Sequence, residues 1–430
     1  MAMRALVVGG LTSGSGKTTV TLGLLRALAQ AGHSVSAAKA GPDYIDGAFL
    51  AAASLSPAVN LDSHAMPDDM IRQLAAGRAG DLLVTEGVMG LFDGTDGGSG
   101  NTAQLAAILG APILLVLDAR HQGQTAAALA AGIRSLLPVG TELAGVVLNR
   151  VASPRHEALI AEALASRDIP HFGSLAVAPS MQVPSRHLGL VQAADLAATD
   201  DLEPLIEAAA RLVSDSLDLA AIIAAAGPLS PAAGTVTPPP PGQRIAIASD
   251  VGFGFAYTHM MDAWRAAGAE ITPFSPLAND APDADADFIF LPGGYPELHL
   301  PALAKAQKFH DGLRAAASRG VRIYGECGGF MTLGEAIIDA DGTAYPMTGL
   351  LHLETSFAAR KLHLGYRGLT PLTDFWPGLG AVTGHEFHYT TAIAARGEPL
   401  FRMRNAAGDD LGTAGLATGS VCGSYAHIIA

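Results

Sequence analysis

The chain has 430 residues, and its 40 acidic and 26 basic side chains give a formal charge of −14 at pH 7. A charge of this sign and size argues against binding to nucleic acid or to an anionic membrane surface. The length predicts two domains, and a hydrophobic content of 49% allows a substantial core. The two cysteines, Cys327 and Cys422, indicate a reducing compartment, and the longest apolar run, at 105–117, is too short to cross a bilayer. We therefore expect a cytoplasmic protein with no membrane partner.

A glycine-rich loop at residues 9–19 lies between a predicted strand at 5–8 and a predicted helix at 18–31. Its sequence is Gly-Gly-Leu-Thr-Ser-Gly-Ser-Gly-Lys-Thr-Thr, and Leu11 stands where the common P-loop spacing has glycine. Glycine lets backbone N–H groups approach phosphate oxygens, and the helix N-terminus adds partial positive charge. The pattern predicts an ATP site formed by Gly14, Gly16, Lys17, Thr18 and Thr19. A glycine turn without a ligand is the alternative.

Within this loop, Lys17 would reach the β- and γ-phosphates, and the Thr18 hydroxyl would hold Mg²⁺. The spacing of the glycines resembles that of dethiobiotin synthetase and its relatives, which phosphorylate or carboxylate small acids. Lysine is scarce in this chain, with five in all, and a lysine within a glycine loop therefore supports the nucleotide site.

Strand-like apolar runs alternate with helical patterns through residues 1–227. Such alternation predicts a parallel sheet covered by helices on both faces, with ligands at the carboxyl ends of its strands. Beyond the first strand and helix, we expect strands at 35–38, 82–85, 113–117 and 144–148, and helices at 68–76, 102–109, 125–136 and 155–165.

Carboxylates follow the second and third of these strands, at the edge where the P-loop lies. They are Asp43, Asp46, Glu86 and Asp93. Mg²⁺ prefers a few carboxylates together with phosphate oxygens and water, so at least two of them are candidates for metal binding or catalysis. The alternative is that they cap helices and turns. Asn149, at the end of the fifth strand, could contact the nucleotide base.

A basic island at Arg186 and His187 stands out in this acidic chain, although a solvated loop is an equally simple explanation. A helical pattern then runs from 195 to 226. The stretch that follows contains four consecutive prolines, which cannot join a helix or a central strand. We therefore expect a first domain at 1–227, a linker at 228–242 and a second domain at 243–430.

The second domain contains a cysteine in a strand–turn–helix context. A predicted strand at 321–325 leads into Gly-Glu-Cys-Gly-Gly at 325–329 and then into a helix. This is the arrangement of a nucleophile elbow, with Cys327 as the nucleophile and the Gly328 N–H as an oxyanion donor. The Gly293-Gly294 loop, after a predicted strand at 288–291, could supply a second donor from Gly294. The alternative is an inert buried cysteine, which is our interpretation of Cys422.

A catalytic thiolate needs a base, and three histidines in the last 50 residues are candidates. They are His385, His388 and His427. Residue chemistry alone does not choose between them.

Together these motifs resemble the cobyrinic or hydrogenobyrinic acid a,c-diamide synthases, which are class I glutamine amidotransferases of cobalamin biosynthesis. The likeness covers essentially the whole chain. It depends on the segments 41–46, 86–94, 184–190, 293–297, 325–329, 384–389 and 423–427. It implies an α/β fold, with a dethiobiotin synthetase-like parallel sheet domain followed by a class I amidotransferase-like domain.

The resemblance implies that Cys327 releases ammonia from glutamine and that His427, in Gly-Ser-Tyr-Ala-His, is its base. Many class I amidotransferases have an acid two residues after this histidine, but this chain has Ile429. The third member of the triad is therefore missing or comes from elsewhere.

For the first domain, the resemblance implies that ATP and Mg²⁺ phosphorylate two side-chain carboxylates in turn, and ammonia then displaces phosphate. Asp43, Glu86 and Asp93 match family positions implicated in this half-reaction, and Thr18, Asp43 and Glu86 are the expected metal ligands. The alternatives are another polycarboxylate tetrapyrrole as substrate, as in the nickel-sirohydrochlorin and cobyric acid branches, or, from a different class, a partitioning-type ATPase switch.

The expected substrates are therefore glutamine, ATP and a polycarboxylate corrinoid, and we allow for a homodimer. A protein with this net charge must bind a polyanion through local basic groups. Arg186 and His187 are the first candidates, and Arg360, Lys361 and His363 form a second group. The alanine- and arginine-rich, lysine-poor composition suggests a GC-rich genome and favours the cobalt-free acid as substrate.

Overall fold

The computed structural model describes residues 3–176, 185–186, 189–190, 192–233 and 239–430. The chain forms two compact units, Met1–Val236 and Thr237–Ala430, called here the synthetase unit and the amidotransferase unit. The division falls within the range 228–242, where the proline run lies. Within the described ranges, no helix has the length and apolar character needed to cross a membrane.

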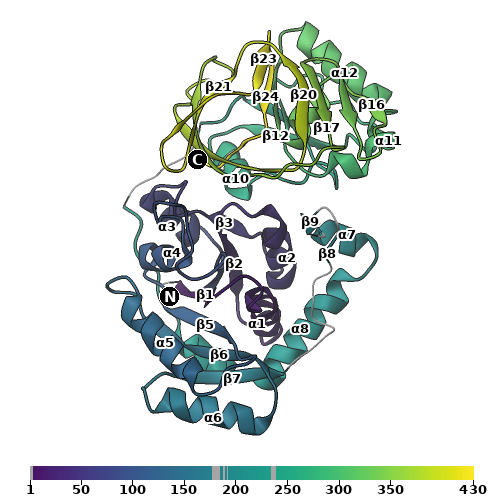
Figure 1. Ribbon diagram of the computed structural model, residues 1–430. Helices are drawn as coiled ribbons and strands as arrows, with labels where there is room; N and C mark the ends of the chain where they lie inside the picture. The colour runs from purple at the N-terminus through teal and green to yellow at the C-terminus, as the bar shows by residue number, and fades with distance from the viewer. Residues whose placement is uncertain (1–2, 177–184, 187–188, 191, 234–238) are drawn as a thin grey trace. The chain divides into compact units, whose positions relative to one another are not determined.

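The synthetase unit is built on the predicted parallel sheet, with strand order β3-β2-β4-β1-β5-β6-β7 (Figure 1). Its central strands are almost fully buried, as expected for a sheet covered on both faces. The short strand β10 pairs antiparallel with β1. The strands are β1 (Arg4–Gly10), β2 (Val35–Ala40), β3 (Val59–Leu61), β4 (Leu82–Glu86), β5 (Ile113–Asp118), β6 (Leu143–Val151), β7 (His171–Ala176) and β10 (Gly227–Pro228).

Helices connect these strands, and three of them have the bounds that the sequence predicted. At α4 the start is set by a local signal, because the Asn101 side chain accepts from the Gln104 N–H, and Ser153 caps α6 in the same way. Helix α1 packs against α2 and α8. The helices are α1 (Lys17–Gln30), α2 (Tyr44–Ser54), α3 (Asp68–Ala76), α4 (Thr102–Leu109), α5 (Thr125–Leu136) and α6 (Pro154–Ala165).

The single helix predicted at 195–226 is wrong, because the structure has three helices there. They are α7 (Ala193–Ala198), α8 (Leu202–Ser216) and α9 (Leu219–Ala225). Asp200 has a left-handed φ of 58°, which interrupts the first helix. Leu217 is extended, and Asp218 caps α9 by accepting from the Ala221 N–H. Apolar periodicity continues through both breaks, so it did not reveal them.

The amidotransferase unit has a central sheet of order β12-β11-β13-β14-β24-β23, parallel except for the β23–β24 pair. Its strands are β11 (Arg244–Ala248), β12 (Glu270–Phe274), β13 (Phe288–Leu291), β14 (Arg322–Glu326), β23 (Leu416–Thr418) and β24 (Val421–Ser424). The helical elements are α10 (Thr258–Ala266), η2 (Pro296–Leu298), α11 (Leu300–Leu303), α12 (Gln307–Ser318) and α13 (Gly328–Leu333). The predicted strands at 288–291 and 321–325 both belong to this sheet.

Two further sheets in this unit, of orders β16-β15-β17-β20 and β22-β21-β18-β19-β25, were not predicted. The second matters for the site, because β25, which begins at His427, pairs antiparallel with β19. Their strands are β15 (Ala336–Ile338), β16 (Ala344–Pro346), β17 (His352–Ser356), β18 (His363–Pro371), β19 (Val382–His388), β20 (Thr391–Arg396), β21 (Phe401–Asn405), β22 (Asp410–Ala414) and β25 (His427–Ile428).

Candidate active sites

The glycine loop lies between β1 and α1, as the sequence predicted. Gly14 and Gly16 have left-handed φ values of 74° and 100°, which favour glycine. A Cβ at Gly16 would collide with the Asn149 side chain, whose Nδ2 donates to the Ser15 carbonyl at 2.8 Å. Asn149 therefore supports the loop from the end of β6, while its predicted contact with a base stays a prediction.

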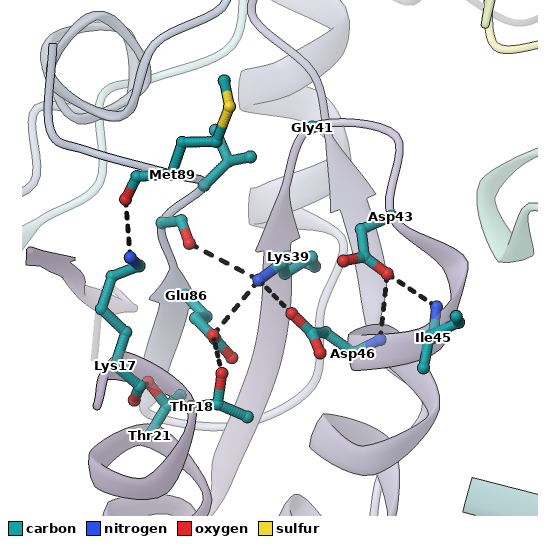
Figure 2. A network of polar contacts seen from close by, with 12 residues as sticks. Lys17, Thr18, Thr21, Lys39, Gly41, Asp43, Ile45, Asp46, Glu86 and Met89 are labelled. Carbon is teal, nitrogen blue, oxygen red and sulfur yellow. Dashed lines mark hydrogen bonds and ion pairs between the residues drawn. The ribbon is translucent and has the colours of Figure 1, made fainter. Parts of the chain in front are cut away.

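Lys17 begins α1 and is buried. Its Nζ donates to the Thr12 carbonyl at 3.1 Å and to the Met89 carbonyl at 2.6 Å, so it spans from the glycine loop to the loop after β4 (Figure 2). Burial lowers the pKa of Lys17 from its ordinary value, although Glu86 opposes this. The two carbonyls thus accept hydrogen bonds from the desolvated Lys17 ammonium. In a P-loop, phosphate oxygens would bind this ammonium instead.

The next residue, Thr18, donates its hydroxyl to Glu86 Oε1 at 2.6 Å. Burial raises the pKa of Glu86 to about 6, with the Lys39 ammonium opposing the shift. A hydroxyl and a carboxylate together at a P-loop helix N-terminus match the oxygen donors that Mg²⁺ uses beside phosphate and water. Across the described ranges, no three His, Cys, Asp or Glu side chains are grouped to hold a metal.

Asp43 and Asp46 lie on the other side of Lys39 from Glu86 (Figure 2). The Asp43 side chain caps α2, with Oδ1 accepting from the Ile45 N–H at 2.8 Å and the Asp46 N–H at 3.1 Å. Burial, and then the Asp46 charge, raise the pKa of Asp43 to about 6. Its position agrees with the cap interpretation, and a metal role for Asp43 stays a prediction.

Asp93 is exposed in the loop after β4, where its Oδ2 accepts from the Gly90 N–H at 3.0 Å. Its charge acts on Lys17. The structure therefore gathers Asp43, Asp46 and Glu86 around Lys39, and it places Asp93 apart on a loop that also binds Lys17. A catalytic role for Asp93 stays a prediction.

The basic island is only partly described. Arg186 ends β8 (Ser185–Arg186), which forms a two-stranded sheet with β9 (Gly189–Leu190). His187 lies outside the described residues. The binding role predicted for this pair stays a prediction.

Cys327 lies between β14 and α13 with φ 45° and ψ −104°, a strained conformation for a residue with a side chain. Its N–H donates to the Ser424 carbonyl at 2.8 Å, which ties the turn to the neighbouring strand β24. Strand, strained turn and helix reproduce the elbow geometry that the sequence predicted.

The two predicted oxyanion donors, Gly328 at the start of α13 and Gly294 in the loop after β13, lie close together. A Cβ at Gly328 would lie 3.2 Å from the Gly294 nitrogen, so the chain at these two positions is close together. A Cβ at Gly293 would lie 2.9 Å from His427 Nε2 and 3.2 Å from Cys327 Cβ. The Gly293-Gly294 loop therefore lines the reacting pair, and glycine is required there by space.

His427 hydrogen-bonds to Cys327, and its Nδ1 lies 3.6 Å from Glu326 Oε2. Glu326 is held in turn, because its Oε1 accepts from the Ile428 N–H at 3.0 Å. Burial alone would lower the pKa of His427, but the contacts with Cys327 and Glu326 outweigh it and raise the pKa to about 10. An acid does therefore lie beside His427, from the position preceding the cysteine.

The other two candidate histidines lie in ring stacks. His385 packs edge-on against Tyr366, and His388 stacks on Tyr425 and His363, with ring centroids 4.1 Å and 4.6 Å away. Burial lowers the pKa of both His385 and His388 to about 3. The structure thus favours His427 as the base.

The remaining candidates have simpler surroundings. Burial raises the pKa of the Cys422 thiol, which fits a structural cysteine. In the second basic group, Arg360 and Lys361 are exposed, whereas His363 is half-buried against His388. Burial raises the pKa of Glu297, which follows the Gly293-Gly294 loop, to about 7, and Arg360 opposes this shift.

Glu326→Gln should reduce the rate of glutamate release from glutamine by about 10²-fold, because His427 loses the group that orients it. Since Glu326 raises the pKa of His427, the substitution should lower that pKa. If protonated His427 is the predicted proton donor to the leaving ammonia, the alkaline limb of the pH–rate profile should therefore move to lower pH.

Glu335→Gln is the matched control, since Glu335 also contacts a histidine, His352, at 2.7 Å, but both side chains are exposed. This variant should retain the wild-type rate and profile. An unchanged alkaline limb in Glu326→Gln would show that Glu326 does not act through His427.

Two family models match separate parts of the chain. The CobQ/CobB/MinD/ParA nucleotide binding domain matches residues 6–188, and the CobB/CobQ-like glutamine amidotransferase domain matches residues 244–430. With the P-loop and the cysteine elbow, these matches define the class: a nucleotide-binding unit joined to a glutamine amidotransferase unit.

Curated relatives match over nearly the whole length. The hydrogenobyrinate a,c-diamide synthase of Rhizobium meliloti (strain 1021) is 49% identical, with 99% of each chain covered. That of Brucella anthropi is 48% identical, covering 99% of this chain and 98% of the relative, and that of Rhodobacter capsulatus is 47% identical, covering 99% of each. The chain belongs to the hydrogenobyrinate a,c-diamide synthase family, which confirms the resemblance stated from its motifs.

Solved structures resemble single units of the chain. The MinD protein of Pyrococcus horikoshii with Mg-ADP is 17% identical at a TM-score of 0.30, covering 42% of this chain and 83% of that one. PurLQS of Thermotoga maritima is 20% identical at a TM-score of 0.30, covering 43% of this chain and 87% of that one.

Proposed function

We propose that this protein converts the a and c side-chain carboxylates of hydrogenobyrinic acid into amides, using ATP and glutamine. Two observations in one chain carry the proposal. The first is a P-loop whose Thr18 hydroxyl donates to the Glu86 carboxylate, next to the buried Lys17, and the second is a Cys327–His427 pair beside Glu326. Relatives at 47–49% identity over 99% of this chain, named for that reaction, support the choice of substrate.

In the amidotransferase unit, the Cys327 thiolate attacks the amide carbon of glutamine. The Gly328 and Gly294 N–H groups stabilise the oxyanion, and protonated His427 gives its proton to the departing ammonia. Glu326 orients His427 and stabilises its charge. Water then hydrolyses the thioester and releases glutamate.

In the synthetase unit, the glycine loop and Lys17 hold the phosphates of ATP, and a substrate carboxylate attacks the γ-phosphorus. Phosphorylation is needed because a free carboxylate would have to expel oxide, whereas the acyl phosphate expels phosphate when ammonia attacks. Thr18 and Glu86 would hold Mg²⁺, with Asp43 as a further candidate. Bound Mg²⁺ would offset charge on the transferring phosphoryl group.

We further propose a cytoplasmic location and a homodimer. The low cysteine content supports the first. The state of association is measured directly by sedimentation of the purified chain.

Mass spectrometry of the corrinoid after incubation with ATP, MgCl₂ and glutamine tests the function. We expect hydrogenobyrinic acid to gain two amides in succession, with ADP formed in step. Efficient amidation of cobyrinic acid with none of the metal-free acid would overturn the choice of substrate. Amidation of neither acid would overturn the proposed function.

A further inference from the structure

Lys39 is the centre of the polar network in the synthetase unit (Figure 2). It lies at the carboxyl end of β2 and is only 4% exposed. Its Nζ contacts Asp46 Oδ2 at 2.5 Å, Glu86 Oε1 at 3.2 Å and the Gly87 carbonyl at 3.5 Å. Burying an ammonium costs several kcal/mol before its pairs compensate, and apolar residues commonly replace such pairs without loss of stability. Stability alone is therefore a weak reason for a lysine here.

The sheet places Lys39 and the P-loop on opposite sides of Glu86. Strand β4 lies between β1 and β2, and Glu86 is in register with Val8 on one side and with Lys39 on the other. The same oxygen, Glu86 Oε1, accepts from Thr18 of the P-loop and pairs with Lys39. Lys17 and Lys39 thus flank this carboxylate from two sides (Figure 2).

Phosphoryl transfer requires the attacking oxygen and the leaving oxygen to be roughly in line through phosphorus. The P-loop holds the leaving side, so the attacking carboxylate must approach from the side away from it. That carboxylate is an anion moving towards phosphate in a site already lined by Asp43, Asp46 and Glu86. A cation on the acceptor side would offset this repulsion, and Lys39 is placed there.

We propose that the Lys39 ammonium binds the substrate carboxylate that is to be phosphorylated. The inference rests on the proposed function and adds to it the residue that receives the acceptor. The carboxylate oxygen forms a bond to the γ-phosphorus as the bond from that phosphorus to the ADP oxygen breaks, and no proton is transferred. Lys39 then remains paired with the acyl phosphate until ammonia attacks its carbonyl carbon and phosphate leaves.

Exposure of the two partners indicates how a carboxylate reaches Lys39. The Asp46 side chain is 20% exposed, whereas that of Glu86 is 1% exposed. The route from solvent therefore passes Asp46, and an incoming carboxylate would take over its place on the ammonium. Because Lys39 is already desolvated, exchanging one carboxylate for another removes little further water from it.

Lys39→Met tests this, since methionine keeps much of the length and removes the charge. We expect kcat/KM for hydrogenobyrinic acid to fall by about 10²-fold or more, with ammonium chloride as the nitrogen source. Affinity for ATP, measured by calorimetry in EDTA so that Glu86 holds no Mg²⁺, should stay within about threefold of wild type, because the Lys39 ammonium contacts Asp46, Glu86 and Gly87 and not the P-loop. Glutamate release at Cys327 should be unchanged. Lys308→Met, at an exposed lysine of α12, is the matched control and should behave as wild type in all three assays.

Corrinoid binding separates this role from a structural one. In the presence of MgCl₂ and a non-hydrolysable ATP analogue, titration with hydrogenobyrinic acid should show about 10²-fold weaker binding to Lys39→Met. If this variant does not fold, Lys39→Met/Asp46→Asn removes both charges of the outer pair and should show the same loss. Wild-type corrinoid affinity in a variant without Lys39, or equal loss of ATP affinity, would overturn the assignment. If the wild-type protein fails to amidate hydrogenobyrinic acid, the proposed function is overturned, and the assignment of Lys39 is overturned with it.

Discussion

Replacing Lys17 by Met is expected to abolish amidation from glutamine and from ammonium salts alike, with a loss on the order of 10³-fold or more in rate. The amine that now donates to the Thr12 and Met89 carbonyls is the group expected to turn to the β- and γ-phosphates. Without it, negative charge on the transferring phosphoryl group loses a contact in a buried site, where electrostatic interactions are strong. No acyl phosphate then forms, so the nitrogen source makes no difference.

The measurements are ADP formation and amide formation, with each nitrogen source in turn. Glutamate release by Cys327 in the same variant reports whether the amidotransferase unit is intact. Lys305→Met, at an exposed lysine, serves as the matched control. Near wild-type amidation from ammonium salts in Lys17→Met would contradict the P-loop assignment.

The fold of the synthetase unit could be predicted because its signals are local. Continuous apolar strands, helical periodicity and capping residues such as Asn101 each lie within a few residues of the feature they define. The helix at 195–226 shows the limit, since apolar spacing persisted across Asp200 and Leu217 although the backbone turns at both. The sheets formed by β15–β22 and β25 were not predicted. Their strands are short, and several of them pair with partners far along the chain, as β17 does with β20 and β19 with β25.

The candidate site residues likewise divide into those with a local sequence signal and those brought together by distant strand pairing. Lys17, Thr18 and Cys327 could be identified as candidates from the sequence because each lies within a contiguous motif. Glu326 was missed as the partner of His427 because the two are 101 positions apart and meet through the pairing of β14 with β24. A carboxylate at the end of a buried strand, next to the nucleophile, was the available signal. Lys39 had a similar signal, because it is a lysine that follows an apolar run.

Cys327→Ser is expected to abolish amidation from glutamine while leaving amidation from ammonium salts near wild type. A serine hydroxyl keeps the shape of the elbow, but it is not ionised near neutral pH and is a far weaker nucleophile than a thiolate. The loss should be on the order of 10³-fold or more in glutamine hydrolysis. The P-loop, Lys17 and Glu86 are untouched, so ammonia supplied from solution still meets an acyl phosphate.

Two companion variants give this prediction its controls. Cys422→Ser removes the other buried thiol and should retain glutamine-dependent activity if that cysteine is structural. His427→Ala should match Cys327→Ser, because His427 hydrogen-bonds to the thiol. His385→Ala should retain activity, since burial keeps that ring neutral beside Tyr366. Loss of glutamine-dependent activity in His385→Ala, with retention in His427→Ala, would show that the base has been misassigned. Equal loss of amidation from glutamine and from ammonium salts in Cys327→Ser would mean that the elbow is not a separate source of ammonia. Only the synthetase half-reaction is common to the two nitrogen sources.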